Sequence, residues 1–176
     1  GFDLANITLI QGKTGWILVD PLTTAPTARN ALAFAREQLG EQKISAIIFT
    51  HSHIDHFGGI DGVLTDNERE QLQVIAPEGF MEEASSENIL AGPTMQRRAQ
   101  YMYGSRLERS ATGHVDTGLG KQPPFGGDIG ILAPTHIVSQ TGQTLTVDGV
   151  EIVFQSTPAS EAPAEMTFYI PPLKAV

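Results

Sequence analysis

Short apolar runs separated by turn residues dominate the first fifty positions of the chain. Two runs, at residues 7–10 and 16–20, flank a Gly- and Lys-containing turn, which predicts a β-hairpin. Apolar side chains then recur at helical spacing over residues 28–39, with Thr27 as the expected N-cap. Residues 44–50, ISAIIFT, are β-branched and almost wholly apolar, so we expect a buried strand there.

The remainder of the chain continues to alternate between strand and helix patterns. Residues 72–77 predict another buried strand and residues 78–91 a helix, and residues 94–107 are expected to be helical in part. Residues 117–136 are dense in Gly and Pro and should be largely irregular. Residues 144–155 carry Asp-Gly between alternating apolar positions, which predicts a two-residue hairpin, and residues 166–171 predict a last strand. We therefore predict an α/β (α+β) fold with mixed sheets and helices on their outer faces.

Composition excludes several classes of function. The chain has 176 residues, enough for one domain with a real core, and its formal net charge of −9 disfavours a nucleic-acid partner. No apolar run approaches the roughly 20 residues that a membrane span needs. The absence of cysteine excludes disulfides, thiolate metal sites and cysteine nucleophiles.

Three of the five histidines lie in THSHIDHFGG, residues 50–59, directly after the predicted strand. Side chains two apart in extended chain share one face, so His51 and His53 can approach one cation. Asp55 and His56 follow where the chain turns, and they can reach a second position nearby. Solvated loop histidines are the alternative, but four ligand-type residues in six positions at a strand end favour a metal site.

Two cations at such a site would suit hydrolysis. Ions about 3.5–4 Å apart can bind a bridging hydroxide and neutralise charge on both sides of an oxygen displacement. Imidazole and carboxylate ligands without thiolate fit zinc best, with manganese or iron as alternatives. His114, in a Gly-containing loop, and His136, just before a predicted strand, lack ligand-like neighbours in the sequence, and we expect both to be surface or turn residues.

The cluster resembles the signature of the metallo-β-lactamase superfamily, whose fold is an αββα sandwich. Within it, the combination of GWILVDPLT, HSHIDHFGG, APEGFMEEASSENILAG, RRAQYMYG, GLGK and TPASEAPAEMTFY resembles the alkylsulfatases that cleave dodecyl sulfate. The resemblance implies hydrolysis of alkyl sulfate esters to alcohol and inorganic sulfate by a metal-bound hydroxide. Another superfamily hydrolase, acting on a thioester, lactone, β-lactam or phosphodiester, is the first alternative, and a non-catalytic binding module is the second.

The resemblance also implies a ligand set for two zinc ions. His51 and His53 match the ligands of the first zinc, and Asp55 and His56 match those of the second. We also assign a catalytic role to Asp55. The next ligand in the alkylsulfatases is a glutamate, which falls on Glu161, or on Glu165 if the register differs.

Two further groups have more than one interpretation. Asp20 ends the strand WILVD, where it either supports the metal ligands, as the resemblance implies, or merely caps the turn before Pro21. Arg97, Arg98 and Tyr101 could bind a sulfate group, but a solvated helix face explains them equally well.

The alkylsulfatases carry more than this chain does. The resemblance places a bridging acidic ligand, a further histidine, a dimerisation region and a lipid-carrier-like domain beyond Val176, so residues 1–176 correspond to the first half to two-thirds of the catalytic domain. We expect this piece alone to bind zinc weakly and to be inactive, and the intact protein to be a homodimer. The residues themselves carry no signal for localisation; the resemblance alone suggests a bacterial, periplasmic or secreted enzyme.

Overall fold

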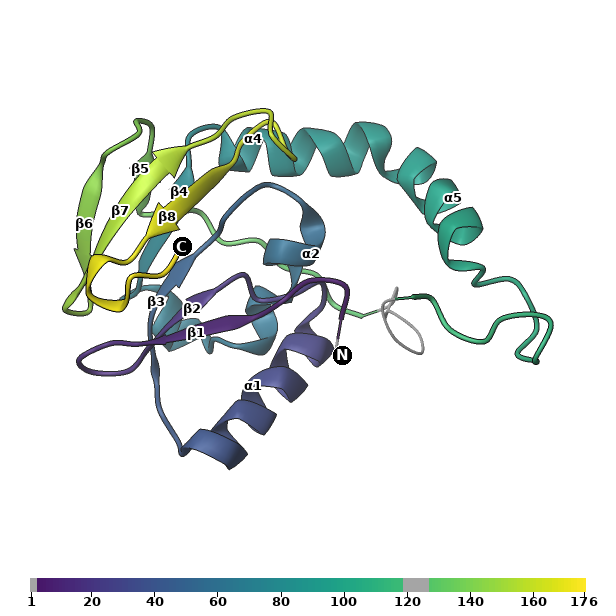
Figure 1. Cartoon of the computed structure of the whole chain (residues 1–176), viewed down its shortest axis with the longest axis horizontal. Helices are drawn as coiled ribbons and strands as arrows, with labels where there is room; N and C mark the ends of the chain where they lie inside the picture. The colour runs from purple at the N-terminus through teal and green to yellow at the C-terminus, as the bar shows by residue number, and fades with distance from the viewer. Residues whose placement is uncertain (1–2, 119–126) are drawn as a thin grey trace.

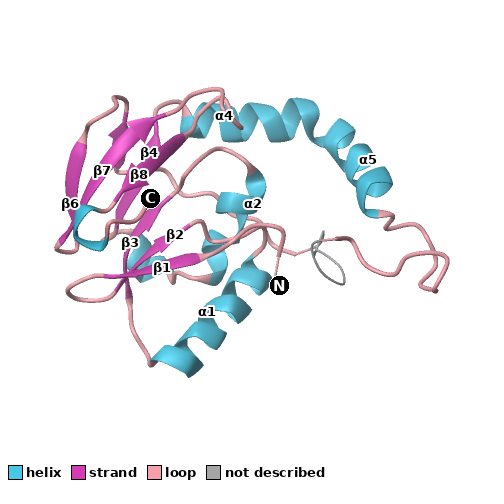
Figure 2. Cartoon of the chain, in the orientation of Figure 1, coloured by secondary structure: helices cyan, strands magenta, loops and turns pink. Residues whose placement is uncertain are grey.

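The computed structural model describes residues 3–118 and 127–176, and it contains two β-sheets that pack face to face (Figures 1 and 2). The first sheet has the strand order β1 (Thr8–Gln11), β2 (Trp16–Val19), β3 (Ile44–Ile48), β4 (Gln73–Pro77), β5 (His136–Val138). Strands β1 and β2 form the predicted hairpin, and β2 to β5 are parallel. The second sheet is antiparallel and comprises β6 (Thr144–Val147), β7 (Val150–Ser156), β8 (Met166–Tyr169). The mixed α/β prediction is confirmed.

The first sheet is buried on both faces because its central strands are apolar at successive positions. On one face, Leu18 and Ile47 pack with residues of helices α1 (Ala25–Leu39) and α4 (Phe80–Ser86). On the other face, Ile17 and Ile48 pack against the second sheet. Strands that are covered on both faces typically have continuous hydrophobic sequences, and the central strands of this sheet have such sequences.

The second sheet is buried on its inner face only. Ile152 and Phe154 point into the core between the sheets, whereas the alternating residues Glu151 and Gln155 are exposed. In the described part of the chain, no α-helix covers this outer face, although a short 3₁₀ helix, η3 (Pro171–Leu173), contacts β7 (Figure 2). The expectation of helices on the outer faces therefore holds for α-helices on the first sheet. The alternation of apolar and polar residues explains why that face tolerates water.

Helix α1 begins earlier than expected. Its N-cap is Thr24, and the hydroxyl of Thr27 hydrogen-bonds back to Thr24, so the prediction of Thr27 as N-cap was wrong. Pro26 lies in the first turn, where a missing N–H costs nothing, and it is compatible with the earlier start. The apolar spacing did not reveal this turn because the turn contains no large apolar residue.

Helical structure after β4 runs without a break through the segment predicted as a helix, residues 78–91, and through part of the segment expected to be partly helical, residues 94–107. Helix α4 continues into a π-helical segment, η2 (Glu87–Ala91), and then into α5 (Gly92–Tyr103). None of the residues of α5 is buried, and α5 extends away from the two sheets (Figure 1).

The Gly- and Pro-rich region is irregular where the structure describes it. The backbone N–H of Ala25 donates to the carbonyl of Asp128 (2.9 Å), and the N–H of Gly130 donates to that of Gly58 (2.8 Å). This segment therefore packs over the start of α1, and residues 119–126, which fall within the predicted loop, lie outside the described residues. Among the described helices, none combines the length and apolar character required to cross a membrane.

Candidate metal centre

The histidine cluster lies at the end of β3, where the chain meets the segment that enters β8. The N–H of Ser52 donates to the carbonyl of Ala164 (3.2 Å), and the N–H of Met166 donates to that of Thr50 (2.9 Å). A short helix, α2 (Ile54–Phe57), starts after His53 and carries Asp55 and His56. The cluster is therefore held between the two sheets.

Glycine after the cluster permits a close approach of two backbone segments. The N–H of Gly59 donates to the carbonyl of Leu22 (2.8 Å), and a Cβ on Gly59 would overlap the carbonyl oxygen of Pro21. A Cβ on Gly58 would overlap the carbonyl oxygen of Thr23 in the same way. These contacts bring α2 against the residues that follow β2, and so bring His56 to Asp20.

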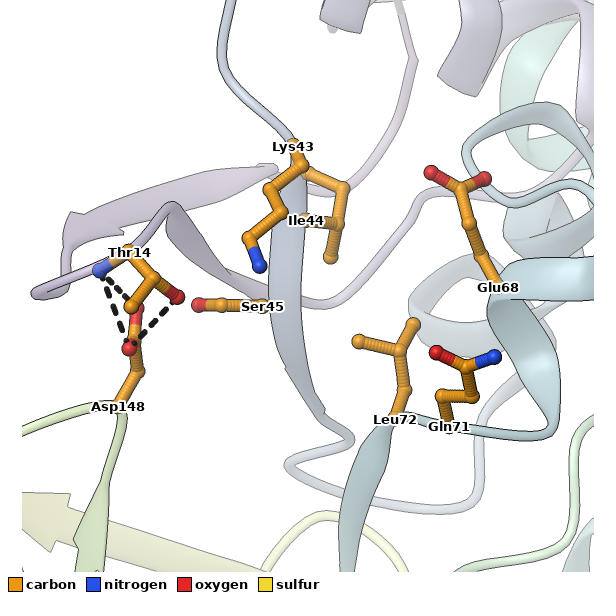
Figure 3. Close-up of a pocket in the computed structure, with 8 residues that line it drawn as sticks. All are labelled: Thr14, Lys43, Ile44, Ser45, Glu68, Gln71, Leu72 and Asp148. Atoms are coloured by element: carbon orange, nitrogen blue, oxygen red, sulfur yellow. Dashed lines mark hydrogen bonds between the residues drawn. The ribbon is translucent and has the colours of Figure 1, made fainter.

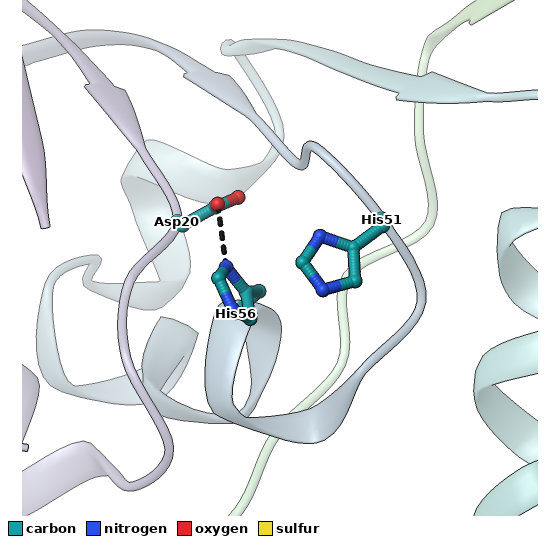
Figure 4. A group of neighbouring side chains, drawn as sticks. All are labelled: Asp20, His51 and His56. Atoms are coloured by element: carbon teal, nitrogen blue, oxygen red, sulfur yellow. Dashed lines mark hydrogen bonds and ion pairs between the residues drawn. The ribbon is translucent and has the colours of Figure 1, made fainter. Parts of the chain in front are cut away.

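Asp20 connects the neighbouring strands and the cluster. It is buried, with a backbone φ of 54°, and its carboxylate accepts bonds from the N–H of Thr50 (2.9 Å) and the hydroxyl of Thr50 (2.6 Å). The Nδ1 of His56 lies 2.7 Å from the same carboxylate (Figure 4). Both carboxylate oxygens of Asp20 thus accept hydrogen bonds from residues at the cluster, and Asp20 does more than cap the turn before Pro21.

The hydrogen bonds around Asp20 determine which nitrogen of two rings carries a proton. The Thr50 hydroxyl has one proton, which goes to Asp20, so it accepts a bond from Nδ1–H of His51 at 2.9 Å. His56 likewise donates from Nδ1 to the carboxylate. In the neutral rings, both Nε2 atoms therefore carry lone pairs, and Nε2 of His51 is buried with no hydrogen-bond partner among the described residues.

The other ligand-type groups converge on these rings. The ring centroids of His51 and His56 are 4.0 Å apart, and those of His51 and His53 are 4.8 Å apart. The Nδ1 of His53 lies 3.8 Å from the carboxylate of Glu161, and Nε2 of His56 lies 3.6 Å from that of Asp55. All four residues of the predicted H-x-H-x-D-H cluster therefore lie together, with Glu161 beside them.

Glu165 occupies a different position. Its carboxylate accepts bonds from the backbone N–H groups of Glu161 (2.6 Å) and Ala162 (2.9 Å). Burial raises the pKa of Glu165, but these two bonds, together with the nearby His51 and His53, outweigh it and the net pKa is lowered. Glu165 thus shapes the loop that carries Glu161, and the geometry favours Glu161 over Glu165 as a ligand.

The two most buried imidazoles differ in their electrostatics. Burial, together with the neighbouring His56, lowers the pKa of His51, which keeps that ring neutral. Burial also lowers the pKa of His56, but the hydrogen bond to Asp20 and the charges of Asp20 and Asp55 raise it above its ordinary value. A neutral His51 is ready to act as a ligand.

The donor set fits a cation that binds nitrogen and oxygen. Within the described ranges, two groups have ligand atoms within 4.8 Å of one another: Asp20 with His51 and His56, and His51 with His53 and Glu161. The unpartnered Nε2 of His51 is the strongest indication, since a buried polar atom without a partner is costly unless something binds it. Because both oxygens of Asp20 already accept bonds, it orients ligands better than it serves as one.

One carboxylate beside the cluster had no signal in the sequence. Glu87, from the π-helical segment η2, lies 3.6 Å from Nε2 of His53. Nothing in the spacing of a glutamate within a helical run identifies it, because the contact depends on how the helix crosses the end of the sheet.

The remaining candidates lie away from the cluster. His136 is exposed at the first position of β5, as expected of a surface residue, and His114 lies in the loop after α5, as expected, although its side chain is buried there. The loop folds back, with the N–H of His114 donating to the carbonyl of Glu108 (2.8 Å). Tyr101 is 91% exposed on the projecting helix α5. A solvated helix face therefore describes Tyr101 better than a sulfate site.

A pocket in the described part of the chain lies at the opposite end of the first sheet (Figure 3). It is formed where β3 and β4 begin, whereas the histidines follow the end of β3. Its lining shares no residue with the cluster: Thr14, Lys43, Ile44, Ser45, Glu68, Gln71, Leu72, Asp148.

Comparisons with known proteins agree with this geometry. Residues 1–139 match the family model described as the metallo-beta-lactamase superfamily. An alkyl/aryl-sulfatase of Saccharomyces cerevisiae is 43% identical over 173 residues, which cover 97% of this chain and 27% of the yeast protein. An (R)-specific secondary-alkylsulfatase of Pseudomonas sp. is 44% identical over 178 residues, covering 100% of this chain and 27% of the relative.

Solved structures also show similarity to an alkylsulfatase and to the metallo-beta-lactamase fold. A stereoselective inverting sec-alkylsulfatase from Pseudomonas sp. has a TM-score of 0.89 and 44% identity, covering 98% of this chain and 27% of its own. A metallo-beta-lactamase family protein from Thermus thermophilus has a TM-score of 0.54 at 22% identity, covering 94% of this chain and 50% of its own, which shows a common fold alone.

These matches confirm the similarity to alkylsulfatases along the whole chain. The chain spans 27% of the length of both the yeast and the Pseudomonas relative. Because a yeast protein is among the relatives, the similarity does not restrict the chain to bacteria.

Proposed function

The chain belongs to the metallo-beta-lactamase superfamily, and from this we propose that the protein containing it hydrolyses alkyl sulfate esters to an alcohol and inorganic sulfate. The observation that supports this substrate class is identity of 41–44% to three alkylsulfatases over at least 97% of the chain. We propose zinc as the metal, with two ions in the intact site, and a homodimer as the assembly.

Five residues of this chain would hold the metals: His51, His53 and Glu161 for the first ion, and Asp55 and His56 for the second. When bound, the metals lower the pKa of water toward 7 and offset the negative charge of a departing sulfate. Nitrogen and carboxylate donors without thiolate match this choice of metal.

The residues of the chain have distinct tasks in this proposal. Asp20 holds the Nδ1 proton of His56 and, through Thr50, that of His51, so that both Nε2 lone pairs face the centre. The side chain of Asp55 is 28% exposed, and it can orient water and accept its proton.

The proposal is tested with the complete natural chain, loaded with zinc and given dodecyl sulfate. We expect release of inorganic sulfate and dodecanol in equal amounts. Hydrolysis of a thioester, lactone, β-lactam or phosphodiester without sulfate release would replace the substrate assignment, and metal binding without any hydrolysis would favour a binding module. The same reaction in ¹⁸O-labelled water shows whether carbon or sulfur is attacked, because the label enters the alcohol or the sulfate respectively.

The variant Asp55→Ala tests the catalytic assignment. Loss of a positioned acid–base group that also binds metal should lower kcat by at least about 100-fold. Glu82→Ala is the control, because Glu82 is exposed on α4 and lies outside the proposed ligand set. An Asp55→Ala protein with the wild-type kcat would remove Asp55 from the mechanism.

A further inference from the structure

The His53 ring lies between two carboxylates. Its Nδ1 faces Glu161 at 3.8 Å, and its Nε2 faces Glu87 at 3.6 Å. Glu161 belongs to the proposed ligand set, whereas Glu87 lies on the opposite side of the ring. The two nitrogens therefore meet different surroundings, and one ring can bind a metal with Nδ1 while Nε2 points away from it.

Burial distinguishes Glu87 from an ordinary surface glutamate. Its side chain is 28% exposed, and its Oε2 is buried with no hydrogen-bond partner among the residues that the structure describes. The side chain of Glu161, in contrast, is 67% exposed. The oxygen that faces Nε2 of His53 is Oε1, whereas the unpartnered oxygen is Oε2, so the Nε2–H of His53 lies at the same carboxylate, beside the atom that lacks a donor.

The helix geometry explains how Glu87 reaches this position. It is the first residue of the π-helical segment η2, where the backbone widens between α4 and α5. The side-chain amide of Asn88 donates to the carbonyl of Ala84 (2.6 Å), which satisfies a backbone acceptor inside this irregular turn. Single π-helical turns within α-helices occur frequently at functional sites.

We propose that Glu87 is a positioning residue that accepts a hydrogen bond from Nε2–H of His53, and so presents the Nδ1 lone pair of that ring to the metal. The inference rests on the proposed function, because it requires a metal beside His51, His53 and Glu161. The separation of 3.6 Å exceeds the roughly 2.7–3.2 Å of an N–H···O bond, so the proposal includes a movement of the Glu87 side chain toward Nε2 when the metal binds. His51 and His56 have such a bond at Nδ1 already, so Glu87 supplies the equivalent for the third ring.

Metal affinity tests this role without any assay of activity. The complete natural chain and its variants are titrated with Zn²⁺ against a chelator of known affinity, and with Co²⁺ while the visible absorption of the bound ion is recorded. Glu87→Ala should weaken binding at one metal position by about 10- to 100-fold and should change the Co²⁺ spectrum. Glu82→Ala, an exposed glutamate of the same helical run, should change neither.

Two conservative variants separate the hydrogen bond from charge and from folding. Glu87→Gln keeps the length and an acceptor oxygen but removes the charge, whereas Glu87→Asp keeps the charge but withdraws the carboxylate by one methylene. We expect Glu87→Gln to bind zinc almost as tightly as the wild type, and Glu87→Asp to bind it nearly as weakly as Glu87→Ala. The comparison of the Gln and Asp variants with the wild type remains informative even if the alanine variant unfolds.

A failure of the proposed role of Glu87 can be distinguished from a failure of the proposed function. If the wild-type chain binds metal and Glu87→Ala binds it equally well with the same spectrum, Glu87 has no positioning role and the metal centre stands. If Asp preserves affinity and Gln loses it, the effect is one of charge, and the hydrogen bond is excluded. If the wild-type chain binds no metal, the proposed function itself fails.

Discussion

The carboxylate of Asp20 shows how much of the candidate site depends on residues outside the ligand motif. It accepts a hydrogen bond from the hydroxyl of Thr50 (2.6 Å) and another from Nδ1–H of His56 (2.7 Å). The Thr50 hydroxyl in turn accepts a hydrogen bond from Nδ1–H of His51. Two imidazoles thus share one anchor. The motif H-x-H-x-D-H predicts which rings lie together, but not the hydrogen bonds that fix their tautomers.

Replacing Asp20 tests this anchoring. Asp20→Ala should weaken zinc binding by about 10- to 100-fold, because both Nδ1 protons lose their fixed acceptor chain. Chelator competition on the complete natural chain measures the change.

Asp3 provides a matched control for that substitution. It is also buried, and it accepts bonds from the N–H and the hydroxyl of Thr23 (both 2.8 Å), but it lies outside the histidine cluster. Asp3→Ala should reduce the free energy of unfolding while leaving zinc affinity unchanged. Equal losses of affinity in both variants would show that Asp20 acts only through general stability.

Residue identities in the cluster were predictable because imidazoles two apart at a strand end share a side. Glu87 and the buried position of His114 were not, since each depends on how a distant segment folds back. The sequence alone does not favour Glu161 over Glu165, because both lie in one short loop, and it is the hydrogen bonds of Glu165 to the backbone that distinguish them in the fold.

At the scale of elements, the turn after the cluster depends on a close backbone contact. Gly59→Ala should lower the free energy of unfolding by about 1–3 kcal/mol, because its Cβ would overlap the carbonyl oxygen of Pro21 and the side chain of Ala28. Gly92→Ala is the control: nothing lies within 4 Å of a Cβ there, and its φ of −49° is helical. Urea unfolding of both variants should show a loss for the first and no loss, or a gain, for the second.

The hairpin turns of the two sheets are joined at the end opposite the histidines. Asp148, in the β6–β7 turn, accepts bonds from the N–H (3.0 Å) and hydroxyl (2.9 Å) of Thr14 and from the N–H of Gly15 (3.1 Å). Burial raises the pKa of Asp148, but the bonds from Thr14, Ser45 and Gly15 outweigh it and lower the pKa below 3.8.

This lowered pKa predicts a pH dependence of stability. Because the folded pKa lies below the ordinary value of 3.8, the stabilisation is complete above pH 3.8 and is lost as the pH falls through the folded value. Asp148→Asn should cost about 1 kcal/mol at pH 7, and the difference from wild type should shrink below pH 3.8. Urea unfolding across this range measures it, and a difference that is constant with pH would contradict the role of the charge.

The elements themselves were largely predictable, because fully apolar runs such as β3 and β4 have few alternatives to a buried strand. The boundaries of the elements were less predictable. The first turn of α1, for example, is defined by a hydrogen bond between the side chains of Thr24 and Thr27 rather than by the spacing of apolar residues. The partial helix expected over residues 94–107 is present as α5, but its junction with α4 through η2 was not predictable from a buried face, since no residue of α5 is buried.

For the whole molecule, removal of metal should lower stability. A ligand that binds only the folded state stabilises it by about 2.7 kcal/mol at 100 times its Kd. Treatment of the complete natural chain with a chelator should therefore lower Tm, and zinc should restore it. His51→Ala should show a smaller chelator-dependent shift, because it removes the buried Nε2. An unchanged Tm in the wild-type chain would count against the metal centre.

The packing of the two sheets has a consequence for the choice of cation. His51 follows β3 of the first sheet, while Glu161 precedes β8 of the second, and the two sheets pack against each other through an apolar layer that includes Ile48 and Phe154. A sideways slip of one layer over the other would open or narrow the distance between these two donors. If an ion binds between these two donors, the size of ion that they prefer would therefore depend partly on methyl and aromatic groups that never touch the ion.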